Sequence, residues 1–381
     1  MTAPIKPPAW APVFLITPRA AKLLMAIEAA KRDVEHLALP PTIETELRRQ
    51  AHLRSTHYST RIEGNRLTLA EAKQVIDAPK VGFRGRERDV REVRNYWNAL
   101  LRVEEWAATG NDVSEDSIRR LHALIEAGPR ARPTPYRDGQ NVIRDAASGA
   151  IVYLPPEAKD VPGLMAALVQ WIRGAEKASV PVPVVAALAH YQFVTIHPYF
   201  DGNGRTARLL ATFLLHRGGY GLNGLYSLEE HHARDLAGYY RALVVHPHHN
   251  YYEGRAACDL TLWLEYFVAT LAETFEAVRK EASRVAKQGA PAVPEALRKL
   301  DRRARIVLGL FADCERIAAV DVARALGLSE RMVRVLLTEW VSDGWLVVVD
   351  PSRRKRAYGL TAIYRQYIGA LSATRGGGRR A

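Results

Sequence analysis

The stretch HPYFDGNGRTAR, residues 197–208, determines how the rest of the sequence is interpreted. Gly202 and Gly204 stand just before a strongly apolar segment that begins near Thr206 and has helical spacing. Glycines let the backbone turn so that successive N–H groups point into one cavity, and free amides at the start of a helix attract anions. The stretch therefore predicts a phosphate-binding loop at a helix N-terminus.

Charged side chains in the same stretch extend the prediction from one phosphate to several. Arg205 and Arg208 are three residues apart, at neighbouring positions on the helix, and guanidinium groups bind phosphate oxygens as two-pronged donors. Asp201 adds a carboxylate, which suits Mg²⁺ bridging phosphate oxygens. His197 ends an apolar segment before Pro198, and an imidazole can accept a proton near neutral pH. We predict a nucleoside triphosphate, Mg²⁺, and a histidine that deprotonates a hydroxyl.

This stretch resembles the signature of Fic (Fic/DOC) proteins, His-Pro-Phe-x-(Asp/Glu)-Gly-Asn-Gly-Arg-x-x-Arg. The one departure is Tyr199, where Phe is usual, at an apolar anchor position. The resemblance extends over roughly residues 10 to 275. It implies a mainly α fold with a helical bundle core and a β-hairpin flap. It also implies that AMP moves from ATP to a Ser, Thr or Tyr hydroxyl of a target protein or of the protein itself.

The resemblance also implies roles for single residues. His197 would be the catalytic base and Asp201 would hold Mg²⁺. The implied phosphate-binding residues are Gly202, Asn203, Gly204, Arg205 and Arg208, with Arg208 on the γ-phosphate. Tyr239 and Tyr240 lie where the family has aromatic residues along the adenine site; since adjacent helical residues face different sides, at most one is expected to stack on the base.

A second motif, STRIEGN at residues 59–65, places Ser59 and Glu63 four residues apart on one helix face, before the helix breaker Gly64. It resembles the family's inhibitory motif, (Ser/Thr)-x-x-x-Glu-(Gly/Asn), on a helix expected at about residues 55–64. The implied arrangement pairs Glu63 with Arg208 and so occupies the γ-phosphate position. Two other roles stay open: a carboxylate that positions water to remove AMP, and a plain surface helix end.

The segment from about Gln140 to Pro155 is predicted to form a β-hairpin. Val142 and Ile143, followed by Arg144, are separated from the apolar Ile151-Val152-Tyr153 by a turn-rich segment. By resemblance this hairpin is the flap that would hold a target segment by strand addition. A surface hairpin without that role is the alternative.

The last quarter of the chain has a different pattern. Residues 286–296 read as a linker rich in small residues, Gly and Pro, and residues 297–381 as a winged helix-turn-helix with a basic tail. Arg331 and Arg334 would lie on the recognition helix, and residues 353–356 (RRKR) would form the tip of the wing. DNA binding and protein binding both remain open for this module.

Composition supports a two- or three-domain organisation. At 381 residues we expect an N-terminal helical region at 1–110 and a catalytic core at 111–285 before the linker. The net charge is +13, and from Ala296 onward 17 Lys/Arg stand against 8 Asp/Glu, an excess of 9 that favours a polyanionic partner for that part. Cys258 and Cys314 are the only cysteines, which argues against a disulfide scaffold.

No signal peptide and no apolar run of about 18 residues is recognisable, so a cytoplasmic protein without a membrane partner is expected. The run HPHHN, residues 246–250, lacks the spacing of a zinc site and is interpreted as a loop.

The sequence is compatible with three functions. The first is a self-inhibited protein adenylyltransferase, and the second is a DNA-binding regulator that senses nucleotide without turnover. The third is the same fold transferring a different phosphate-containing group. The target protein, the base preference and the oligomeric state, a homodimer included, cannot be read from the sequence.

Overall fold

The computed structural model describes residues 10–37, 39, 41–78, 81–129, 131–144, 148–287, 300–311, 314–352 and 356–365. The chain forms two compact units. The first comprises Met1–Glu35 and Gln50–Lys280, and the second comprises His36–Arg49 and Glu281–Ala381. The N-terminal region and the core expected to divide near residue 110 thus lie mostly in one unit, whereas most of the expected linker falls outside the described residues.

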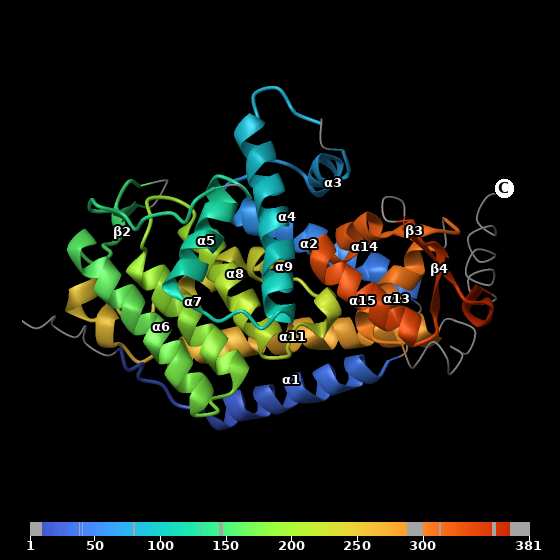
Figure 1. The fold of residues 1–381 in the computed structure, drawn as a ribbon. Helices are drawn as coiled ribbons and strands as arrows, with labels where there is room; N and C mark the ends of the chain where they lie inside the picture. Colours follow the sequence, from blue (N-terminus) through green and yellow to red (C-terminus); the bar gives the residue numbers. More distant parts are fainter. Residues whose placement is uncertain are drawn as a thin grey trace, which may run out of the picture. The chain divides into compact units, whose positions relative to one another are not determined.

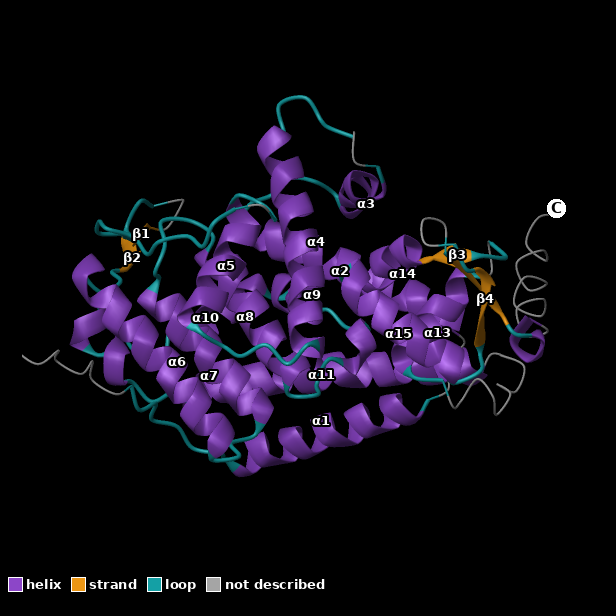
Figure 2. Ribbon diagram, viewed as in Figure 1, coloured by secondary structure: helices purple, strands orange, loops and turns teal. Residues whose placement is uncertain are grey.

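The first unit is helical, as expected (Figures 1 and 2). Its helices, in chain order, are α1 (Pro18–His36), α2 (Pro41–Ile62), α3 (Leu69–Asp77), α4 (Glu87–Ala108), α5 (Glu115–Glu126), α6 (Val161–Lys177), α7 (Val182–Ile196), α8 (Asn203–Arg217), α9 (Leu228–Arg234), α10 (Leu236–Leu243) and α11 (Thr261–Lys287). Three of these helices extend into the second unit. The last residue of α1, residues 41–49 of α2 and residues 281–287 of α11 belong to that unit.

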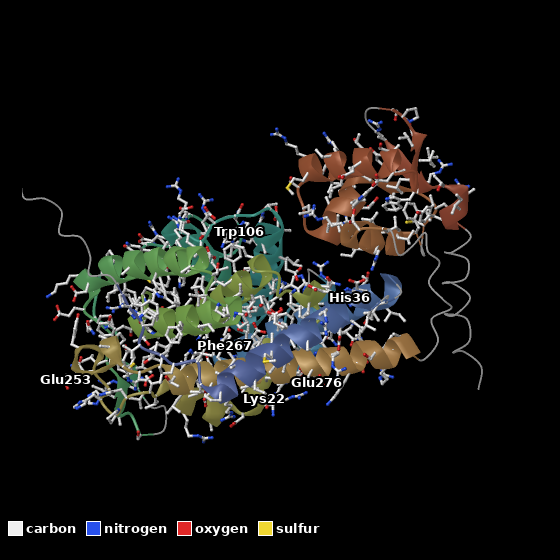
Figure 3. The ribbon with its side chains drawn as sticks, turned by 90° about the horizontal axis from the view of Figure 1, so that it is seen from below. Lys22, His36, Trp106, Glu253, Phe267 and Glu276 are labelled. Carbon is white, nitrogen blue, oxygen red and sulfur yellow. The ribbon has the colours of Figure 1, made fainter. Side chains whose placement is uncertain are left out.

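Helices α7 and α8 form the centre of this unit, packed against each other and flanked by α4, α5 and α6. Nearly every side chain of α7 is buried, as expected for a helix that is apolar on all sides. Trp106 of α4, labelled in Figure 3, packs edge-on against Phe213 of α8 at a centroid distance of 5.9 Å. The loop between α7 and α8 is therefore anchored at both ends in the core.

Helix starts follow the expected capping chemistry. The Ser114 hydroxyl accepts a hydrogen bond from the Ser117 amide (3.0 Å) at the start of α5, and the Thr17 hydroxyl accepts one from Ala20 (3.1 Å) before α1. Helices α1 and α11 run side by side in the same direction, since Thr17 bonds Glu265 at one end and Asp33 pairs with Arg279 (3.7 Å) at the other. Figure 3 shows the two helices, with Lys22 labelled on α1 and Glu276 labelled on α11.

The predicted hairpin is present and short. Strand β1 (Ile143–Arg144) pairs antiparallel with β2 (Ile151–Tyr153), with Ile143 opposite Tyr153. Residues 145–147 of its turn lie outside the described part. Tyr153 ties the hairpin to the core, because its buried hydroxyl donates to the Thr195 carbonyl of α7 (2.6 Å).

The second unit has the element order expected from the sequence. It contains α13 (Arg302–Leu310), β3 (Ile317–Ala318), α14 (Ala319–Leu326), α15 (Glu330–Ser342), β4 (Leu346–Asp350) and β5 (Ala357–Leu360), with the antiparallel sheet order β3-β5-β4. Trp340 and Trp345 lie in its core with ring centroids 5.3 Å apart. Among the described helices of the whole chain, none combines the length and the apolar character needed to cross a bilayer.

Candidate active site

His197 caps the C-terminus of α7 in a left-handed conformation, with φ 51° and ψ 60°. Its ring Nδ1 lies 3.2 Å from the Val194 carbonyl, which can only accept; the proton therefore sits on Nδ1 and Nε2 is left with its lone pair. Burial of the ring lowers its pKa to about 4, against the opposing effect of that hydrogen bond and of Glu63. At neutral pH the side chain is therefore an uncharged imidazole that can accept a proton at Nε2.

A buried arginine that the sequence analysis missed holds the loop after His197. The Arg137 side chain is 4% exposed; its Nε donates to the His197 carbonyl (2.9 Å), and its backbone N–H donates to the Pro198 carbonyl (2.9 Å). Asn141 adds a side-chain bond to the Tyr199 carbonyl (3.1 Å). The segment that leads into the hairpin thus fixes the backbone on which His197 is carried.

The start of α8 has the glycine-containing turn that the sequence predicts. Gly202 precedes the helix with φ 75°, a conformation that favours glycine. Asn203 donates to and accepts from the Tyr199 backbone (2.7 and 3.0 Å), so its side chain shapes the loop, while its N–H belongs to the first helical turn. A Cβ on Gly204 would meet Glu63 Oε1 at 2.2 Å, which means that a carboxylate lies directly over the helix start.

Arg208 lies at this end of the site in the arrangement expected from the two motifs. Its NH2 donates to Glu63 Oε1 (2.9 Å) and to the Ser59 carbonyl (2.9 Å), and its Nε donates to the Ser59 hydroxyl (2.9 Å). The arginine side chain is 3% exposed and the glutamate 31%. Burial by itself would lower the pKa of Arg208, but the Glu63 carboxylate raises it, so the guanidinium stays charged.

The helix that carries Ser59 and Glu63 is longer than predicted and ends slightly earlier. Helix α2 spans 22 residues and ends at Ile62, so Glu63 and Gly64 form the turn after it, with φ 89° at Gly64. Asn65 fixes this turn by donating to the Asp89 carbonyl and to Glu92 (both 3.0 Å). Glu63 is thus held at a helix end rather than inside a helix.

Arg205 lies in a different environment from the one expected. Only 1% of its side chain is exposed, and its NH2 lies 2.9 Å from Glu126 and 3.3 Å from Asp201. The guanidinium is therefore paired with carboxylates of the protein itself, Glu126 and Asp201 and, at 3.8 Å, Glu92. Glu126 comes from the end of α5, and no local pattern in the sequence connects it with the motif.

Asp201 is the carboxylate for which the sequence predicts Mg²⁺ binding, and both of its oxygens accept hydrogen bonds within the protein. Its Oδ1 accepts from the Gly202 amide (2.6 Å) and from Arg205, whereas Oδ2 accepts from Arg88 of α4 (3.0 Å). The His122 ring, with its pKa lowered to about 4 by burial, lies 2.9 Å from the Asp201 carbonyl and stacks on Tyr199. The donor set fits the ion, because Mg²⁺ keeps several waters and takes one or two carboxylates together with nucleotide phosphates.

The two adjacent tyrosines of α10 differ in exposure. Tyr239 is 2% exposed and its hydroxyl bonds His190 (3.1 Å), whereas Tyr240 is 47% exposed, with its hydroxyl 3.5 Å from the Ile62 carbonyl. Only Tyr240 therefore offers a free ring face. The flap residues Val142, Ile143 and Arg144 lie at and before β1, as expected. Across the described residues, no cluster of three or more His, Cys, Asp or Glu side chains is arranged to hold a metal, the 246–250 loop included.

Comparison with known proteins gives the same family as the motif. A model of the Fic/DOC family matches residues 112–215. The chain is 32% identical over 182 residues to the protein adenylyltransferase Fic of Drosophila grimshawi and 31% identical to that of Drosophila melanogaster; each match covers 45% of this chain. The matches span about a third of the relatives' own length, 35% and 34%.

Solved structures extend the likeness to most of the chain. A Fic family protein from Desulfovibrio desulfuricans is 26% identical with a TM-score of 0.58, covering 93% of this chain and 99% of the other. A Fic domain protein from Bacteroides thetaiotaomicron, 24% identical, has a TM-score of 0.60 over 70% of this chain and 98% of its own. Residues 112–215 therefore match the Fic/DOC family, and the fold resembles that of a solved Fic family protein over most of the chain.

Proposed function

We propose that the protein transfers AMP from ATP to a Ser, Thr or Tyr hydroxyl of a protein, its own chain included. The observation that carries the proposal is the convergence at the start of α8. An uncharged His197, a buried Arg208 and the first-turn amides lie around one helix terminus. The relatives named protein adenylyltransferase Fic support the same activity.

The chemistry assigned to His197 is proton acceptance at Nε2. As the proton of the target hydroxyl passes to Nε2, the hydroxyl oxygen bonds to the α-phosphorus of ATP. The bond from that phosphorus to the bridging oxygen breaks, and pyrophosphate leaves with the electron pair. Because Nδ1–H donates to the Val194 carbonyl, the ring keeps one orientation during the transfer.

The phosphates are assigned to Arg208 and to the N–H groups of Asn203 and Gly204, which have no acceptor within the first helical turn. Asp201 is assigned to Mg²⁺, which when bound neutralises charge on phosphate oxygens. Arg205 is assigned a different task from that expected, which is to hold Asp201 and Glu126. Tyr240 is assigned to the adenine ring, and β1 to an extended target segment.

We further propose that Glu63 inhibits the transfer. Its carboxylate occupies the guanidinium that would hold the γ-phosphate and covers the amides at Gly204. ATP would then bind only with its α-phosphate out of line with the acceptor. A carboxylate in this place could also orient water for removal of AMP from a modified hydroxyl, and the two activities are separable by supplying either ATP or an AMP-modified protein.

The direct test is incubation of the purified chain with ATP labelled at the α-phosphate, in a Glu63→Gly background. Label on protein, with a gain of one AMP in intact mass, is the expected result, and His197→Ala should remove it. Absence of label at every Mg²⁺ concentration would favour a nucleotide sensor without turnover. Thermal shifts with ATP, GTP, CTP and UTP test whether the transferred group is another nucleotide.

A second candidate function belongs to the C-terminal unit. Three helices followed by a β4–β5 hairpin, with Arg331 exposed on α15, support a winged helix-turn-helix that binds DNA. The RRKR segment proposed for the wing lies at residues 353–356, of which only Arg356 is among the described residues. Salt-dependent retention of the full chain on duplex DNA, lost when all four basic residues are replaced, would support this function, whereas no retention at low salt would exclude it.

A further inference from the structure

The two charged ends of the candidate nucleotide site are already neutralised by side chains of the chain itself. At one end the cation Arg208 is paired with the anion Glu63 (2.9 Å). At the other end the anion Asp201 is paired with the cation Arg88, whose NH2 lies 3.0 Å from Oδ2. Each pair joins a residue of the 197–208 stretch to a residue from the N-terminal part of the chain.

The Arg88 guanidinium lies on the oxygen of Asp201 that a cation would need. The other carboxylate oxygen, Oδ1, is taken by the Gly202 amide and by the buried Arg205. The Asp201 side chain is 58% exposed, and the partner of its Oδ2 is Arg88. A metal ion that binds Oδ2 must therefore displace the guanidinium or approach beside a like charge.

Arg88 can break its contact with Asp201 and still keep its hydrogen bond to Glu92. Its Nε donates to Glu92 Oε1 (2.8 Å), and the side chain is 66% exposed, so the terminal NH2 can turn away while the Glu92 contact stays. Glu92 in turn keeps a bond from Asn65 (3.0 Å), two residues after Glu63. Removing Arg88 therefore leaves no buried carboxylate without a partner.

We propose that Arg88 is a competitor of Mg²⁺ at Asp201, the counterpart of the Glu63 carboxylate at the phosphate position. In the resting protein an arginine holds the metal ligand and a glutamate holds the phosphate ligand. The inference rests on the proposed nucleotide site but needs no AMP transfer. Arg88 thereby raises the Mg²⁺ concentration at which the metal and the nucleotide bind.

The test compares Arg88→Gln with Arg91→Ala in the full chain. Arg91 is exposed on the same helix and has no ion pair among the described residues, so its loss removes the same charge without touching Asp201. In a Glu63→Gly background with α,β-methylene ATP, thermal shift against MgCl₂ gives the Mg²⁺ concentration for half of the effect. We expect Arg88→Gln to lower it up to about five-fold, the range of exposed ion pairs, and Arg91→Ala to leave it unchanged.

A second titration needs no nucleotide and no change at Glu63. Mn²⁺ binding to the free protein, followed through the electron paramagnetic resonance signal of unbound Mn²⁺, should tighten in Arg88→Gln by the same factor, and Asp201→Asn should remove this binding. If Arg88→Gln weakens metal binding in either titration, Arg88 assists the site and the proposal is wrong. An unchanged Mn²⁺ titration also overturns it, whether or not AMP transfer is ever observed.

Discussion

The two ends of the site differ in burial, although both consist of one arginine and one carboxylate. The Arg208 and Glu63 side chains are 3% and 31% exposed, and Ser59 adds two further acceptors for the same guanidinium. Arg88 and Asp201 are 66% and 58% exposed. Water screens the second pair and not the first, so equal distances of about 3 Å correspond to very different free energies. We therefore expect the loss of the buried pair to affect nucleotide binding more than the loss of the exposed pair.

The largest effect is expected from breaking the buried pair. Glu63→Gly frees Arg208 for the nucleotide, so AMP incorporation should rise on the order of ten- to a hundred-fold, the equivalent of about 1.4 to 2.8 kcal/mol. The initial rate with labelled ATP measures it. Glu265→Gly, which removes a carboxylate that pairs with Thr17 and Arg19 instead of Arg208, is the control for general loss of acidic charge. An unchanged rate in Glu63→Gly would contradict the inhibitory role.

A comparable effect, on stability instead of rate, is expected from removing a neutral partner of the same guanidinium. Ser59→Ala leaves Arg208 Nε without its acceptor in a fully buried position, which should cost about 1.5–3 kcal/mol of stability. The melting temperature of the full chain measures the loss. Ser114→Ala, which removes a helix cap away from the site, should cost only about 1 kcal/mol. Equal losses of stability in both variants would show that the hydrogen bond to Arg208 contributes no more than an ordinary helix cap.

Salt sharpens the comparison at the exposed end. Raising the ionic strength from about 0.05 M to about 0.5 M shortens the screening length to a few ångströms. The difference in Mg²⁺ requirement between wild type and Arg88→Gln should then disappear, whereas the rate increase caused by Glu63→Gly should persist. The same thermal-shift and labelling measurements at two salt concentrations check both. If high salt abolished the rate increase caused by Glu63→Gly, the Glu63–Arg208 pair would be screened by solvent like an exposed ion pair.

The smallest effect is expected from pH between 5 and 7. With the pKa of His197 lowered to about 4 by burial, about nine tenths of the side chain is still deprotonated at pH 5. A base must be deprotonated to act, so AMP incorporation should fall by only about a tenth over this interval and drop steeply below pH 4. A histidine with its ordinary pKa near 6.5 would lose most of its activity by pH 5, and that pH profile would contradict the assignment.

Much of the fold and of the site follows from local sequence patterns. The hairpin and the order of elements in the C-terminal unit were both predicted from spacing and turn residues. The length of α2 was not, because polar side chains such as Thr56 and Thr60 are fully buried in it and the helix shows no apolar stripe. A helix whose buried face is polar cannot be bounded by hydrophobic periodicity.

The supporting residues around the loop could not be predicted either. Arg137, His122 and Glu126 come from segments about 60 to 80 positions away from the loop, and none belongs to a recognisable motif. The positions of Arg205 and Arg208 could be predicted, but not their orientation. A spacing of three residues places two side chains near each other on a helix, but it does not say that Arg205 pairs with Asp201 and Glu126 while Arg208 pairs with Glu63.

Residue types and their spacing already specify the chemical groups of the candidate site: a histidine, a carboxylate, an amide-rich turn and two arginines within twelve positions, with an acid at the end of a second motif. These groups can be recognised from the sequence because each motif depends only on residues that are close together in the chain. The packing of the helices, by contrast, sets which carboxylate each arginine contacts and how exposed each ion pair is to water. Pairing and screening depend on helices that are remote in the chain, such as α2, α4 and α5, and burial is a property of the packed whole.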